Sequence, residues 1–155
     1  MILRLGDCLN LMHDIPNGSI DMILCDLPYG ITRNRWDSVI DLDSLWRAYK
    51  RVIKDNGAIV LFSAEPFTSK LITSNIKMFR YDLIWSKCQG SDFLNANRKP
   101  LRSHENICVF YKKQPKYSPQ KTDGKPYKIH RRRNHSENYG AYTLVPESIN
   151  ADGKR

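Results

Sequence analysis

Residues 20–30 read IDMILCDLPYG, a short apolar run that ends at an acidic residue and a turn. Apolar runs of about four to eight residues between turn signals are typical of strands buried in a parallel sheet. The preceding Pro16-Asn17-Gly18-Ser19 is a strong turn signal. We therefore predict a buried strand over residues 20–25, with polar chemistry beginning at Asp26, where the strand stops.

The flanking sequence alternates between strand and helix patterns. Residues 1–5 favour a short strand and residues 8–12 a helical turn. Apolar side chains recur at helical spacing over residues 42–53, and Asn56-Gly57 is expected to close that helix. A second buried strand is predicted over residues 58–63 and another helix over residues 66–75. This alternation predicts an α/β fold with a parallel sheet.

Two more strands are predicted over residues 79–85 and 105–111. The long connection between them, residues 86–104, is expected to be functional or mobile. From Lys112 onward four prolines interrupt any regular pattern, so this segment is expected to be irregular or partly disordered when alone. The predicted organisation is a folded part over 1–111 and a separate basic segment over 112–155.

The positive charge is concentrated in that basic segment. The chain carries a formal net charge of +9. Lys and Arg exceed Asp and Glu by two over residues 1–111 and by seven over residues 112–155. A basic segment joined to a nearly neutral part is typical of polyanion binders, because phosphate contacts supply most non-specific nucleic-acid affinity. Solubility alone is the alternative explanation.

The cysteines and apolar runs argue against two other classes. The four cysteines form no CxxC pair and have no regular spacing with the four histidines, so no metal site is expected. There is no secretory signal, and the longest apolar runs are far shorter than the roughly 20 residues of a membrane span. These features favour a cytoplasmic protein with free thiols and no membrane association.

Two polar motifs follow predicted strands. Gly6-Asp7-Cys8 comes after the first strand and Asp26-Leu27-Pro28-Tyr29-Gly30 after the second. In an open α/β sheet, ligands bind beyond the carboxyl ends of the strands. Both motifs are therefore predicted to point into one crevice, where they could face the same ligand.

The sequence from Leu5 to Trp36 resembles the start of the N6-adenine and N4-cytosine DNA methyltransferases. Their catalytic motif is usually Asp/Asn/Ser-Pro-Pro-Tyr, and here Asp26-Leu27-Pro28-Tyr29 has Leu27 in place of the first proline, a variant similar to that of phage-encoded members. The placement after a buried strand makes the match more specific than the tetrapeptide, which alone could be an ordinary turn. The resemblance implies a partial Rossmann-like methyltransferase sheet, with parallel strands and a C-terminal hairpin.

The resemblance also implies a set of catalytic and cofactor-binding residues. Asp26 and the Leu27 carbonyl would accept the two amino hydrogens of a target base, and Pro28 belongs to the same motif. The ring of Tyr29 would stack on the base after it is flipped out of double-stranded DNA. The methyl donor would be S-adenosylmethionine (SAM), held through Asp7, Cys8, Cys25 and Asp26. Asp7 could instead, or in addition, simply cap the helical turn that follows it.

Further positions are implied for the target base and for DNA. Residues 58–67 resemble one wall of the base pocket, with Ser63, Glu65 and Pro66 at its mouth. The DNA-binding candidates are basic: Arg102, Lys128, Arg131, Arg132 and Arg133. Each has a plainer interpretation, a surface ion pair of Arg102 with Glu105 and a solvated charge run in the basic segment.

The family's Phe-x-Gly-x-Gly loop, which holds the methionine part of SAM, has no counterpart here, because all eight glycines are isolated. Three hypotheses remain open: a methyltransferase fragment that is inactive alone, a two-part enzyme completed by the missing C-terminal half or by a second copy, and a non-catalytic DNA-binding module. RNA and protein-glutamine methyltransferases use similar motifs, but the basic segment argues against a protein substrate. Asp at the first motif position favours adenine N6 over cytosine N4.

Overall fold

The computed structural model describes residues 2–122, 124, 127–130 and 148–151, the last two segments as backbone. The chain divides into two compact units, Met1–Lys116 and Tyr117–Arg155. The first unit contains α1 (Cys8–Met12), β1 (Ile20–Asp26), α2 (Leu42–Val52), β2 (Ile53–Ser63), α3 (Phe67–Ser74), β3 (Phe79–Ser91), a 3-10 turn η1 (Phe93–Asn95) and β4 (Arg102–Phe110). The second contains β5 (Tyr127–His130) and β6 (Ser148–Ala151).

The first unit is built on a four-stranded sheet with the order β1-β2-β4-β3. β1 and β2 run parallel, and β4 runs antiparallel to both β2 and β3. The predicted parallel pair and the predicted hairpin of the last two strands are thus confirmed, in one mixed sheet. The carboxyl ends of β1 and β2 lie at the same edge, because Asp26 is opposite Phe62 in the register.

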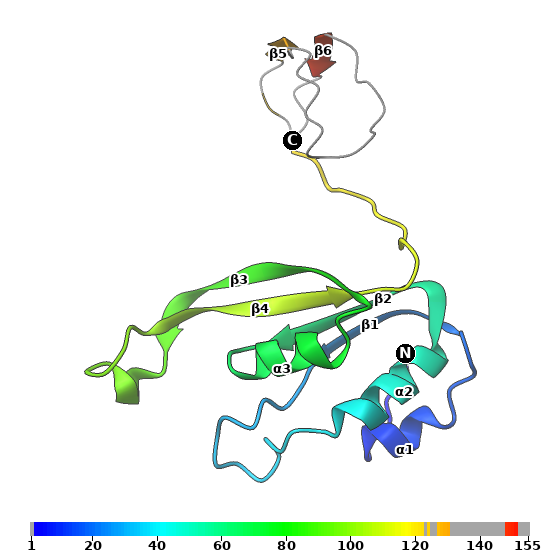
Figure 1. Cartoon of the computed structure of the whole chain (residues 1–155), viewed down its shortest axis with the longest axis vertical. Coiled ribbons are helices and arrows are strands. Elements are labelled where there is room, and N and C mark those ends of the chain that lie inside the picture. The colour runs from blue at the N-terminus through cyan, green and yellow to red at the C-terminus, as the bar shows by residue number, and fades with distance from the viewer. Residues whose placement is uncertain (1, 123, 125–126, 131–147, 152–155) are drawn as a thin grey trace. The chain divides into compact units, whose positions relative to one another are not determined.

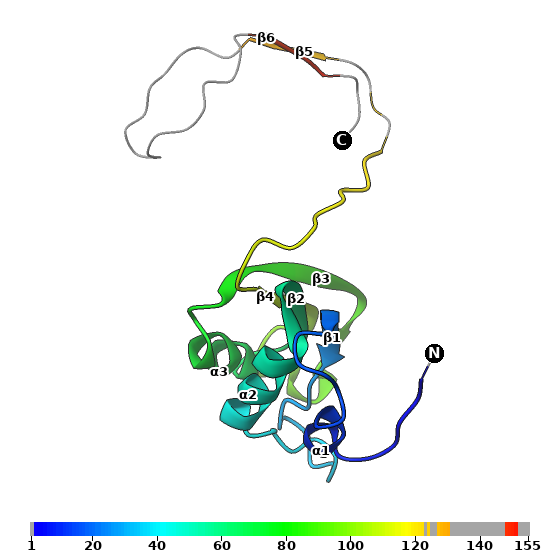
Figure 2. The same cartoon turned by 90° about the vertical axis from the view of Figure 1, so that its right-hand side faces the viewer.

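Helices α2 and α3 pack on one face of this sheet (Figures 1 and 2). The apolar stripe predicted over residues 42–53 supplies Leu45, Trp46 and Val52 to the core, each at most 3% exposed. Trp46 packs against Phe110 of β4, with 4.9 Å between ring centroids, and its Nε1–H donates to Ser74 Oγ at the end of α3. One side chain therefore ties both helices to the sheet.

The other face of the sheet is open and apolar within the part of the chain that the structure describes. Met22 and Leu24 of β1 and Leu83 and Trp85 of β3 are all more than half exposed. Their register places them on the face opposite α2 and α3, because strand side chains alternate between faces. Asp26 belongs to this open face as well.

Three local predictions were wrong. Residues 2–5 form no strand, because this segment pairs with no neighbouring strand, and Leu5 is fully exposed. Asn56-Gly57 does not close α2: the helix ends at Val52, Ile53 turns into an extended conformation, and the pair lies inside β2. The connection between the last two strands is also shorter than expected, because β3 and β4 pair as far out as Ser91 and Arg102.

The second unit contains a small antiparallel pair, in which Tyr127 is opposite Ala151 and His130 opposite Ser148. The sequence, with its scattered prolines, gave no indication of this pairing. Strand pairing joins segments about 20 residues apart, and no local pattern in this chain signals it.

Candidate active site

Asp26 is the last residue of β1, at the edge of the sheet where β2 also ends. The side chain is exposed and lies on the open face. The next residue, Leu27, is 5% exposed and packs into the core, so it anchors the turn immediately after the carboxylate. The buried Leu27 side chain thus holds the turn that follows the Asp26 carboxylate.

Tyr29 turns back over Asp26. Its hydroxyl donates a hydrogen bond to Asp26 Oδ1 at 2.6 Å, and its ring stacks on Phe67 of α3 with 5.5 Å between centroids and 24° between planes. Burial and, second, this hydrogen bond raise the pKa of the Tyr29 phenol well above its usual value. The phenol therefore stays protonated and acts as the donor toward the carboxylate.

The loop after Tyr29 is held by Asp37, a residue that the sequence analysis missed. Its carboxylate is 7% exposed and accepts hydrogen bonds from the backbone N–H of Gly30 at 2.8 Å, Ile31 at 3.0 Å and Thr32 at 2.7 Å. Hydrogen bonding from Thr32 and from Gly30 lowers the pKa of Asp37 to about 2. Asp37 is therefore ionised at neutral pH and fixes the loop through three charge-assisted bonds.

Two of the residues predicted at the mouth of the site, Glu65 and Pro66, lie in the loop between β2 and α3. Glu65 accepts from the Ser69 hydroxyl, and its carbonyl accepts from Arg102 Nη2 at 2.9 Å. The ion pair of Arg102 with Glu105 suggested by the sequence is wrong, because Glu105 pairs with Lys87 across the hairpin. Ser63 was expected at the mouth but is 0% exposed, since it ends β2 facing α3 and accepts a hydrogen bond from Thr68.

The cofactor candidates lie on two neighbouring elements. Asp7 caps α1 by accepting from the Asn10 N–H at 3.0 Å, the capping role allowed for in the sequence analysis. Burial raises the pKa of the Cys25 thiol, and Cys8 adds to the shift in the same direction. Asp7 and Cys8 thus stand at the start of α1, and Cys25 and Asp26 at the end of β1.

The DNA-binding candidates belong to both units of the chain, and three of them lie outside the described residues. Arg102 begins β4 near the site, and Lys128 lies in β5 of the other unit. Arg131, Arg132 and Arg133 lie outside the described residues. Among the described residues, no cluster of His, Cys, Asp and Glu could hold a metal ion, and no helix is long and apolar enough to cross a bilayer.

Comparison with known proteins adds a family and a fold. A family model described as DNA methylase matches residues 20–151. The cytosine-N4-specific PvuII DNA methyltransferase superposes with a TM-score of 0.58 at 17% identity, over 72% of this chain and 49% of that one. The M1.HpyAVI-SAM complex gives 0.54 at 18% identity, over 79% of this chain and 61% of that one. TTHA0409 of Thermus thermophilus, in complex with S-adenosyl-L-methionine, gives 0.51 at 16% identity, over 76% of this chain and 57% of that one.

These superpositions show that the sheet and its helices have the methyltransferase arrangement, as predicted. This chain spans between 49% and 61% of the length of the three solved chains.

Proposed function

This chain belongs to the DNA methylase family whose model matches residues 20–151, and on that basis we propose that it takes part in methylating an exocyclic amino group of a base in double-stranded DNA. The observation that carries this proposal is the Asp26–Tyr29–Phe67 arrangement. The exposed Asp26 carboxylate lies at the carboxyl end of β1 and accepts a hydrogen bond from Tyr29. The ring of Tyr29 stacks on Phe67. The proposed substrate is a base that has left the duplex, because the amino group is otherwise inaccessible.

The chemistry proposed for Asp26 is alignment. The lone pair of an exocyclic amine is delocalised into the ring, which makes the nitrogen a poor nucleophile. If the Asp26 carboxylate and the Leu27 carbonyl accept the two amino hydrogens, the nitrogen becomes more tetrahedral and its lone pair is directed at the methyl group. Fixed acceptors of this kind lower the barrier through positioning and electrostatics.

Tyr29 and Phe67 support the stacking role. The Tyr29 ring has one face on Phe67, so its other face is the one proposed to receive the base. The Tyr29 hydroxyl holds one oxygen of Asp26, and a carboxylate has acceptor capacity left on both oxygens. Asp37 fixes the loop on the far side of Tyr29 and is proposed as a positioning residue for the motif.

S-adenosylmethionine is the proposed methyl donor. Asp7 uses one oxygen to cap α1 and is otherwise exposed, so it can accept from the adenine amino group of that ligand. Cys8 and Cys25 are proposed to line the pocket for the same ligand. When bound, SAM supplies an activated methyl group on a sulfonium sulfur.

Adenine N6 is the target that we propose, because the motif begins with Asp. Cytosine N4 is the second candidate, since the PvuII enzyme, named as cytosine-N4-specific, is among the similar structures. The experiment that separates them uses a complete version of the enzyme, in which a glycine-rich SAM loop is present. It is incubated with labelled SAM and unmethylated DNA, and the nucleosides are analysed by mass spectrometry. We expect N6-methyladenine, and N4-methylcytosine in its place would overturn the adenine assignment.

The role of Asp26 is tested in the same assay. Asp26→Ala should abolish methylation and leave DNA binding intact, whereas Asp21→Ala is the matched control. Asp21 lies on the same strand, is exposed, and pairs with Lys54 at the opposite end of the sheet. Full activity of Asp26→Ala would remove this carboxylate from the mechanism.

A second measurement asks whether the chain acts alone. No described element supplies a glycine-rich loop for the methionine part of SAM, and β1 is an edge strand of the described sheet, along which a further strand could pair. Calorimetry with SAM should therefore give weak binding by the isolated chain. Tight binding would reject both the inactive fragment and the non-catalytic DNA-binding module.

A further inference from the structure

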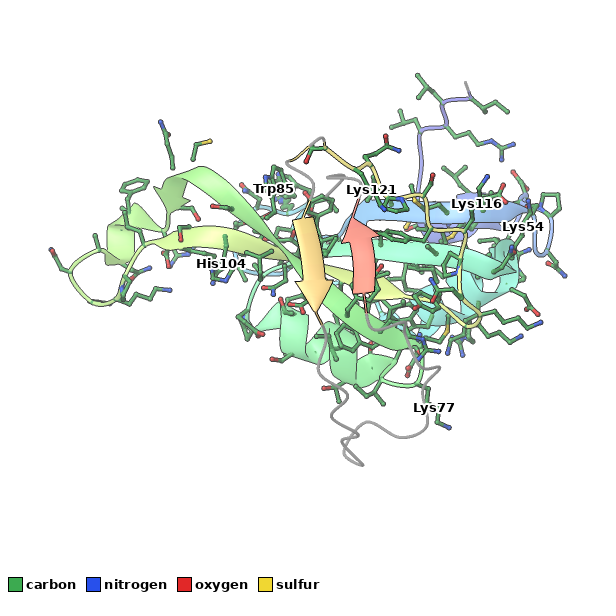
Figure 3. The ribbon with its side chains drawn as sticks, turned by 90° about the horizontal axis from the view of Figure 1, so that it is seen from above. Lys54, Lys77, Trp85, His104, Lys116 and Lys121 are labelled. Atoms are coloured by element: carbon green, nitrogen blue, oxygen red, sulfur yellow. The ribbon has the colours of Figure 1, made fainter. Side chains whose placement is uncertain are left out.

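A cavity lies at the opposite end of the sheet from Asp26. It has a volume of about 340 Å³ and is formed by the end of α2, the start of β2, the segment after α3 and the residue that follows Tyr111. β1 and β2 are parallel, so the start of β2 and the end of β1 lie at opposite ends of the sheet, measured along the strands. Figure 3 shows Lys54 and Lys77 toward this end, and Trp85 and His104 toward the other.

The lining of this cavity is strongly basic. Four lysines contribute to it: Lys50, Lys54, Lys77 and Lys112. Lys54 pairs with Asp21, and Lys112 shares Asp55 with Lys113. Within residues 2–122, neither Lys50 nor Lys77 has an acidic partner. The lining thus contains four lysines and one carboxylate, Asp55, so the cavity has uncompensated positive charge.

The same cavity is lined by Asn75, whose side-chain amide is unsatisfied. Asn75 is 6% exposed, and its Nδ2 is buried with no hydrogen-bond acceptor among the described residues. A buried donor without a partner is costly, so buried amides in native proteins are normally paired. Asn75 thus lines the cavity with an unused donor that a small movement of its side chain would expose, beside lysines that lack an anion.

The carbonyl groups at the C-terminus of α2 are already hydrogen-bonded and would not repel an anion in the cavity. Helix C-termini carry partial negative charge on their last carbonyls. In this chain the Arg51 and Val52 carbonyls accept from Gly18 and Ser19 at 2.9 Å each. The groups left facing the cavity are therefore mainly donors and cations.

We propose that this lysine cavity, lined by Lys50, Lys54, Asn75, Lys77 and Lys112, is a phosphate-binding site. The unpaired lysines supply the charge that attracts the phosphate, and the Asn75 side chain turns to donate its amide to a phosphate oxygen. The phosphate belongs either to the DNA backbone or to a free phosphorylated ligand. The site is separate from the Asp26 edge and does not depend on methyl transfer, so its test succeeds or fails independently of the proposed function.

The test uses pyrophosphate as the probe, with the full chain in an amide-detected NMR titration at low salt. We expect the Asn75 side-chain resonances to shift and saturate. The Lys50→Gln/Lys77→Gln variant should weaken this binding at least tenfold. Lys70→Gln with Lys87→Gln removes the same charge from residues that do not line the cavity, and should leave the affinity within about twofold. Pyrophosphate that fails to shift Asn75, or equal weakening in both double variants, would overturn the site.

The source of the phosphate is distinguished by DNA binding. In a salt titration with duplex DNA, each phosphate contact contributes about 0.9 to the slope of log affinity against log salt. If the backbone occupies the site, Lys50→Gln/Lys77→Gln should lower the slope by about 0.9 to 1.8 relative to the Lys70/Lys87 control. If pyrophosphate binds but the slope is unchanged, the site serves a free phosphorylated ligand.

Discussion

Phe67 supports the ring of Tyr29, so its replacement should affect both stability and the site. The side chain is 2% exposed. Phe67→Ala removes a buried ring, which typically lowers the free energy of unfolding by about 3–5 kcal/mol. Phe67→Leu keeps most of the volume but loses the contact with Tyr29, and ring pairs contribute roughly 0.5–1.5 kcal/mol beyond their buried area. Domains of ordinary stability have about 5–15 kcal/mol, so Phe67→Ala would unfold a domain at the low end of this range, and Phe67→Leu is the variant expected to stay folded.

The assay combines urea unfolding with the NMR signals of the Tyr29 ring protons. Leu71→Ala is the control, because Leu71 is 0% exposed on the same helix and has no ring contact with Tyr29. It should destabilise by about 2–5 kcal/mol but leave the Tyr29 signals in place. Both Phe67 variants should move them. Unchanged Tyr29 signals in Phe67→Leu, or an equal movement in Leu71→Ala, would refute the idea that Phe67 supports the stacking ring.

Three further predictions concern the loop and one buried phenol. Asp37→Ala should speed amide hydrogen exchange at the three loop N–H groups it binds, and unchanged protection would exclude its anchoring role. Gly30→Ala should lower the thermal unfolding temperature of the protein more than Gly18→Ala does. Both glycines have positive φ, but only at Gly30 would an added Cβ meet a side chain, that of Val39 at 2.7 Å. Burial raises the pKa of the Tyr49 phenol above its value in the unfolded chain, which is about 10. The neutral phenol therefore contributes its full stability below about pH 10, and this contribution is lost as the pH rises above that value. Ultraviolet titration should show no Tyr49 ionisation at pH 11; a signal lost in Tyr49→Phe at that pH would contradict this.

The sequence by itself determined the strands and helices that carry the site. Their patterns are local: the apolar run before Asp26 predicted β1, and helical spacing over residues 42–53 predicted α2, because burial on one face imposes a period on the chain. The family resemblance came from the same short stretch. Asp26 and Tyr29 could be proposed as site residues because the local sequence shows both their residue types and their position after a strand.

Only the tertiary structure decided which distant groups meet. Phe67 behind Tyr29, Arg102 on the Glu65 carbonyl and the Lys87–Glu105 pair all join residues that are 18 or more positions apart, and side-chain type alone does not specify such partners. The lysine cavity also depends on packing, because it unites three separate segments around Asn75. These groups meet because the helices bury their apolar faces against the sheet. That burial is the physical reason why the sequence predicted the elements and the motif, while the contacts within the site required the fold.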